Sequence, residues 1–164
     1  MDPSKPVVIF DFDQTVIEQD SSQFLRDFYG FSCNHFASTY PEQENMYLDC
    51  LFKKCGVSHS DLADAMKGLV FNDQMKYLIM GLGDEFNLVI LSSGFVFYIE
   101  SFLRKENMEN YFQKIVAHPY KIRLDGSLVM TPLHHQVCAH NSYFKVEICT
   151  RCTDSVGICS FRDA

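Results

Sequence analysis

The sequence has few basic residues and no long uncharged apolar run. Its 164 residues include 14 Lys and Arg against 21 Asp and Glu, which gives a formal net charge of -7. Nucleic-acid-binding proteins usually present a basic face, so this charge balance argues against that function. No uncharged stretch reaches the roughly 18 residues of a transmembrane helix, and the opening MDPSKP lacks the basic and apolar regions of a signal peptide. We therefore expect a cytoplasmic protein with no nucleic-acid and no membrane partner.

The sequence also lacks a disulfide framework and the common nucleotide-binding loops. Its seven Cys are an odd, scattered set, which suits a reducing compartment. Neither GxxxxGK[ST] nor GxGxxG occurs, so a loop that cradles nucleotide phosphates is not expected. What the chain does contain is 47% hydrophobic residues with 15 Phe, enough for the packed core of one domain.

Alternating strand and helix signals predict an α/β fold. Runs of β-branched and other apolar residues at 7–10, 87–91 and 114–118 are typical of buried strands. Helical patterns fill the sequence between the first two runs and return at 95–108, and Asp125-Gly126 predicts a hairpin turn. A strand that leads to a polar turn and a helix, repeated along the chain, is the sequence form of a parallel sheet.

Polar side chains follow two of these strands. Asp11 and Asp13 come at the end of the first, and Ser92 comes directly after the second. One alternative is that the two acids simply end a strand, with Asp13 or Thr15 as the cap of the next helix. Ligands of parallel α/β sheets bind beyond the carboxyl ends of the strands, so the third polar group favours a binding site.

The motifs around these residues resemble a known family. FDFDQT, residues 10–15, is similar to the DxDxT signature of haloacid dehalogenase-type phosphatases. LSSGFVFYIE, residues 91–100, is similar to the ISDxNxFFIE segment of the phospho-type branch, which includes phosphoethanolamine/phosphocholine and pyridoxal phosphate phosphatases. The DG hairpin and the later Cys149-x-x-Cys152 recur in the same order. The resemblance covers nearly the whole chain and weakens after Thr131.

The resemblance implies a haloacid dehalogenase-like core, which is a partial Rossmann-like parallel sheet. A helical cap is inserted after the first strand. The core is expected at residues 1–19 and 73–164 and the cap at 20–72. Such a cap moves, excludes water and selects the substrate.

The same resemblance implies a chemistry. Asp11 would attack phosphorus and form an aspartyl-phosphate, and Asp13 would act as general acid and then general base. Mg²⁺ would lie against the Asp11 carboxylate and the Asp13 main-chain carbonyl, and Ser92 would donate a hydrogen bond to a phosphate oxygen. The expected function is Mg²⁺-dependent hydrolysis of a small phosphorylated metabolite, such as pyridoxal 5'-phosphate, phosphocholine or phosphoethanolamine.

Several positions depart from the branch. Ser22 and Ser93 stand where acids contact the substrate head group, which leaves these serines as candidate substrate-binding residues unless Asp20 takes the first role. Ser160 falls where a lysine holds the phosphate, and the GDGxxD motif that completes the metal site is absent. The alternative function is therefore a catalytically weakened relative that acts as a metal-binding or protein-interaction module.

The strand that carries the GDGxxD motif is absent with it, which suggests a C-terminally truncated or divergent chain. The first strand would then lie at the edge of the sheet, where exposed N–H and C=O groups favour self-association. The alternative is a compact variant with a rearranged edge.

The last part of the chain is rich in potential metal ligands. A single CxxC, with nearby thiols and imidazoles, offers enough donors for structural zinc. The spacing matches no paired-CxxC ribbon, however, and the resembling branch has a similar stretch that needs no zinc for its chemistry. The residues concerned are His134, His135, Cys138, His140, Cys149, Cys152 and Cys159.

Overall fold

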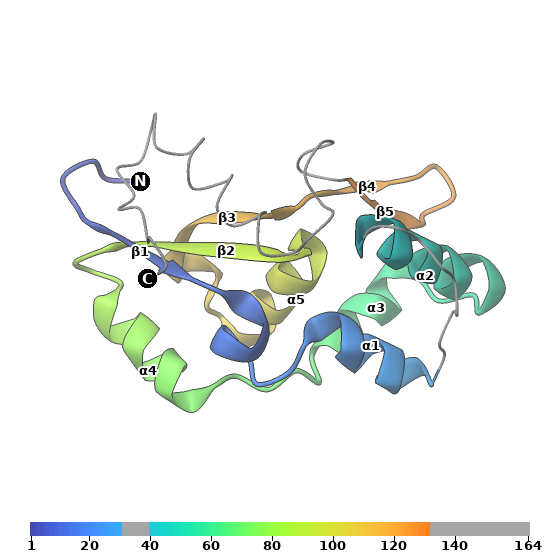
Figure 1. Ribbon diagram of the computed structural model, residues 1–164, viewed down its shortest axis with the longest axis horizontal. Helices are drawn as coiled ribbons and strands as arrows, with labels where there is room; N and C mark the ends of the chain where they lie inside the picture. Colours follow the sequence, from blue (N-terminus) through green and yellow to red (C-terminus); the bar gives the residue numbers. More distant parts are fainter. Residues whose placement is uncertain (31–39, 132–164) are drawn as a thin grey trace, which may run out of the picture.

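The computed structural model describes residues 1–30 and 40–131 (Figure 1). Within these ranges it is an α/β structure, as predicted. The elements are β1 (Val7–Phe10), the turn η1 (Phe12–Val16), α1 (Ser21–Tyr29), α2 (Tyr40–Lys54), α3 (His59–Met66), α4 (Asp73–Leu82), β2 (Asn87–Phe95), α5 (Val96–Glu106), the turn η2 (Glu109–Tyr111), β3 (Phe112–His118), β4 (Tyr120–Ile122) and β5 (Leu128–Met130).

Three strands form a parallel sheet in the order β1-β2-β3. In β1, Phe10 lies opposite Ile90 of β2. Ile79 of α4 and Phe102 of α5 belong to the same buried cluster as these two side chains, so both helices contribute to the core around the sheet. The expected strand positions, the parallel arrangement and the hairpin of β4 with β5 are confirmed. Within the described ranges, β1 is an edge strand.

Strand β2 is longer than the sequence predicts. It continues past Leu91 to Phe95, with an irregular register between these two residues. Phe95 is fully buried, pairs with His118 of β3, and packs its ring on Tyr98 at a centroid distance of 4.9 Å. This tertiary packing extends the strand, so Ser92 lies in its irregular end and not after it.

Side chains cap the helices where the sequence offers suitable residues. Asn72 accepts hydrogen bonds from the N–H groups of Gln74 and Met75, which confirms it as the cap of α4. Asp20, and neither Asp13 nor Thr15, occupies the cap position of α1.

Helix α2 is joined to the elements that follow β2 by polar side chains. The Asn45 amide bonds both the N–H and the C=O of Met130 in β5, at 2.7 and 2.9 Å. Glu44 is fully buried and accepts hydrogen bonds from Tyr98 of α5 at 2.5 Å and from Arg26 of α1 at 2.8 Å. Because a buried carboxylate is costly without partners, these two donors are needed for α2 to pack here.

Of the helices that the structure describes, none has the length and apolar character required to cross a bilayer.

Candidate active site

Asp11 directly follows the last residue of β1. Its backbone is extended, and its carboxylate accepts a hydrogen bond from the Phe12 N–H at 2.9 Å. The side chain is half-buried at the carboxyl end of the strand. The bond to the next residue fixes the direction in which this carboxylate points.

The turn after β1 brings Asp13 back to the same end of the sheet. Gln14 adopts a left-handed conformation with φ of 56°, which is uncommon for a residue with a side chain. The Ile17 N–H closes the turn on the Phe12 carbonyl at 3.2 Å. Backbone conformations of this kind concentrate at functional sites, because the surrounding structure must hold them.

The Asp13 carboxylate lies between α1 and the end of β2. Its Oδ1 accepts the N–H of Ser21, the first residue of α1, at 2.8 Å. On the other side is Gly94, where a Cβ atom would lie 3.2 Å from Asp13 Oδ2 and 3.1 Å from Ser92 Oγ. The structure therefore brings Asp13 and Ser92 to one place, with Asp11 close enough for its charge to act on Asp13.

The surroundings of Asp13 favour its protonated form. Burial raises the pKa of Asp13 from 3.8 to about 6, and the charges of Asp20 and Asp11 act in the same direction. The hydrogen bonds from Ser21 oppose the shift but do not cancel it. A carboxyl group with a pKa near 6 can both give and take a proton near neutral pH, as general acid–base catalysis requires.

Ser92 is buried, and its hydroxyl oxygen accepts the N–H of Gly94 at 3.0 Å. A hydroxyl that accepts through oxygen still has its own proton to donate, so it suits an anionic oxygen at this edge. Ser93 is half-buried in the same irregular stretch, and Ser22 is buried in the first turn of α1. The carboxylate of Asp20 accepts the Gln23 N–H at 2.8 Å as the helix cap.

Asp11 and Asp13 offer the oxygen donors that Mg²⁺ prefers. Mg²⁺ commonly binds one or two carboxylates and completes its shell with water and substrate phosphate, so the chemistry of this pair fits that ion. Within 1–30 and 40–131, no group of three or more His, Cys, Asp and Glu side chains gathers as a metal site. Ser160 and the His- and Cys-rich stretch lie outside the described residues.

Two residues of the site are not indicated by sequence patterns. Ser21 contributes its backbone N–H to Asp13 from eight positions away, and its buried side chain lies beside the same carboxylate. Gly94 matters because of the space it leaves, and only the glycine that ends the Ser-Ser-Gly stretch hints at this.

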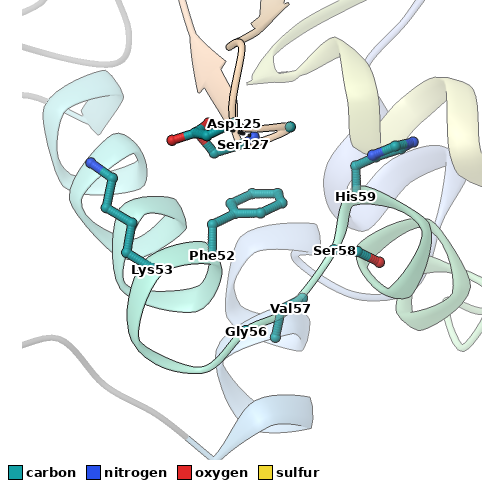
Figure 2. Close-up of a pocket in the computed structure, with 9 residues that line it drawn as sticks. Phe52, Lys53, Gly56, Val57, Ser58, His59, Asp125 and Ser127 are labelled. Atoms are coloured by element: carbon teal, nitrogen blue, oxygen red, sulfur yellow. Dashed lines mark hydrogen bonds between the residues drawn. The ribbon is translucent and has the colours of Figure 1, made fainter.

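A separate hollow of about 490 Å³ lies between the α2–α3 connection and the β4–β5 turn. Figure 2 shows the Phe52 ring pointing between the turn, at Asp125 and Ser127, and His59 at the start of α3. None of the predicted site residues lines this hollow.

Comparisons with known proteins show which family the chain matches. A family profile described as Putative Phosphatase matches residues 6–156. Human phosphoethanolamine/phosphocholine phosphatase is 26% identical over 142 residues, which cover 81% of this chain and 53% of the human protein. The chain spans about half the length of the curated relatives it matches.

Solved structures show the same fold. A HAD family hydrolase from Salmonella enterica has a TM-score of 0.62 at 14% identity, covering 96% of this chain and 55% of its own. A phosphoserine phosphatase structure, described as a phospho-aspartyl intermediate analogue, has a TM-score of 0.56 at 15% identity. The match covers 94% of this chain and 74% of the phosphoserine phosphatase chain. These likenesses establish a haloacid dehalogenase-like fold.

Proposed function

The chain belongs to the phosphatase family described as Putative Phosphatase, and from this premise we propose that it hydrolyses a small phosphate monoester through an aspartyl-phosphate on Asp11. The observation that carries the proposal is that Asp11 and Asp13 follow β1 at its carboxyl end, where the Asp13 carboxylate lies beside Ser92 of β2. The phosphoserine phosphatase of similar fold supports the covalent route, because its description names a phospho-aspartyl intermediate.

The two carboxylates have complementary roles in this route. An oxygen of Asp11 forms a bond to phosphorus while the bond between phosphorus and the leaving alkoxide breaks, and Asp13 gives its proton to that alkoxide. Water then attacks the phosphorus, Asp13 takes its proton, and the bond between Asp11 and phosphorus breaks to release phosphate. The raised pKa of Asp13 supports both of its steps, because the group must hold a proton first and accept one later.

We assign Mg²⁺ to the Asp11 carboxylate and the main-chain carbonyl of Asp13. When bound, the ion would neutralise the charge that otherwise keeps an anionic nucleophile away from an anionic phosphate. The Ser92 hydroxyl would donate to a phosphate oxygen, since its oxygen already accepts a backbone N–H and a hydroxyl can donate its own proton at the same time.

Residues 20–72 would form the cap over a core of residues 1–19 and 73–164, with Ser22 and Ser93 facing the substrate. The human relative is named for phosphoethanolamine and phosphocholine, so these esters and pyridoxal 5'-phosphate are the substrates to test. Since hydroxyls stand where the phospho-type branch carries acids, we expect a weaker preference for substrates with an ammonium group.

The second candidate is a relative that binds metal or another protein without turnover. The observation in its favour is that no third metal-ligating side chain completes a metal site with Asp11 and Asp13 within the described part of the chain. Such a module would associate with another chain through the free edge of β1, since among the described strands β1 forms hydrogen bonds only with β2.

The deciding experiment measures phosphate release from a panel of esters, with and without Mg²⁺, for the wild type and Asp11→Asn. We expect slow, Mg²⁺-dependent release that Asp11→Asn abolishes while the far-UV circular dichroism stays unchanged. In Asp13→Asn, release should fall by roughly 10²- to 10⁴-fold, as is usual for loss of a general acid. Turnover that survives Asp11→Asn would rule out the covalent route, and a wild type inactive on every ester would favour the second candidate.

A further inference from the structure

Gly94 is a glycine whose backbone does not require glycine. Its φ is not positive, in contrast to Gly30, Gly56 and Gly126, so any side chain could adopt its conformation. What excludes a side chain is space. The Cβ of an alanine would lie 3.2 Å from Asp13 Oδ2 and 3.1 Å from Ser92 Oγ, closer than ordinary van der Waals contact.

Neither neighbour can easily give way. Ser92 is buried, and its Oγ is held at 3.0 Å by the N–H of Gly94 itself. The Asp13 carboxylate is held from the opposite side by the Ser21 N–H, at 2.8 Å. A methyl group at position 94 would therefore push the carboxylate against α1 or turn it away from Ser92.

We propose that Gly94 is a positioning residue for Asp13, and that the space it leaves sets the Oδ2 atom beside the Ser92 hydroxyl. This inference rests on the proposed function. In that reaction Ser92 binds a non-bridging oxygen of the phosphate while Asp13 must reach the bridging oxygen of the same group. Because Oδ2 and Oγ both lie within 3.2 Å of one point, a single phosphate ester can bridge them.

The first test compares Gly94→Ala with Gly81→Ala, since a Cβ at Gly81 meets nothing within 4 Å. Each variant is assayed on p-nitrophenyl phosphate, whose leaving group departs without a proton, and on phosphoethanolamine, whose alkoxide needs one. Gly94→Ala should lose on the order of 10²-fold in kcat on phosphoethanolamine and far less on p-nitrophenyl phosphate. Gly81→Ala should change neither rate.

An equal loss on both esters would overturn the positioning role and leave the proposed function standing. A wild type that hydrolyses no ester of the panel proposed above would instead refute the proposed function, and a second measurement then decides the placement of Asp13. In NMR spectra of the full chain, the Ser21 amide resonance should shift in Gly94→Ala and stay in place in Gly81→Ala. A Ser21 amide that is unchanged in Gly94→Ala would overturn the inference regardless of activity.

If Gly94→Ala does not fold, the clash between the alanine Cβ and Asp13 can be measured by removing the Asp13 carboxylate. Asp13→Ala takes away Oδ2, so Gly94→Ala should cost less unfolding free energy in that background than alone. A double variant that folds where the single variant does not supports the inference. An equal cost in both backgrounds, or a double variant that also fails to fold, contradicts it.

Discussion

Replacing Asp13 by Asn should stabilise the protein at pH 8 and leave its stability almost unchanged at pH 4. The pKa of Asp13 is raised from 3.8 to about 6 by burial, so the folded protein must ionise this group at a cost that the unfolded chain does not bear. Asn keeps a carbonyl oxygen that can accept the Ser21 N–H, and it carries no charge at any pH.

The sign follows from which state holds the proton more tightly. Between pH 3.8 and about 6 the folded wild type binds more protons than the unfolded chain, so its stability falls as the pH rises through this window. Each pKa unit corresponds to about 1.4 kcal/mol, which puts the full cost near 3 kcal/mol. Because the side chain is only partly shielded from water, we expect Asp13→Asn to gain about 1 to 3 kcal/mol at pH 8.

Urea unfolding at pH 4, 6 and 8 in the presence of EDTA measures this gain. Asp84→Asn, which neutralises an exposed carboxylate, serves as the control and should stay within about 0.5 kcal/mol of wild type at each pH. The reasoning is refuted if Asp13→Asn gains nothing at pH 8, or if it gains as much at pH 4 as at pH 8.

Three further outcomes are expected. Tyr98→Phe removes the hydroxyl that bonds the buried Glu44 and should lower the unfolding free energy by about 1.5 to 3 kcal/mol in urea titrations, whereas Tyr77→Phe on the exposed face of α4 should change it little. Asn45→Ala loses both bonds to the β5 backbone and should cost about 1 to 3 kcal/mol by the same measurement. Millimolar Mg²⁺ should raise the melting temperature of the wild type by linkage but not that of Asp11→Asn, and an equal rise in both would argue against metal at Asp11.

The sequence alone predicts the elements whose signals are local. Short β-branched runs identify β1, β2 and β3, because strands buried in a parallel sheet are apolar on both faces. Asn72 is recognisable as a helix cap because the cap and the amides it binds are adjacent in sequence. The extension of β2 to Phe95 is not recognisable in this way, since it depends on packing against His118 and Tyr98.

The residues of the candidate site also fall into those with a local sequence signal and those that depend on tertiary packing. Its acids and Ser92 are visible as polar residues at the ends of predicted strands. The hydrogen bond from Ser21 to Asp13 cannot be predicted from the sequence, because Ser21 donates through a backbone N–H that every residue but proline has. Gly94 is equally hidden, since the distance from its Cβ position to Asp13 depends on how the η1 turn folds against β2.

The polar contacts of α2 bear on how far a cap could move. Tyr120, where the hairpin begins, bonds Glu100 of α5 at 3.2 Å and packs on the Phe95 ring, while the last hairpin strand bonds Asn45 of α2. Tyr120 and Met130 are cross-strand partners, so the contacts with α5 and with α2 meet at the same end of the hairpin. Moving α2 away from α5 would break the bond between Tyr98 and Glu44. It would also either carry the hairpin outward with α2 or break the Asn45 bonds and the Arg123–Asp49 pair, so these contacts together resist any widening of an entrance for substrate.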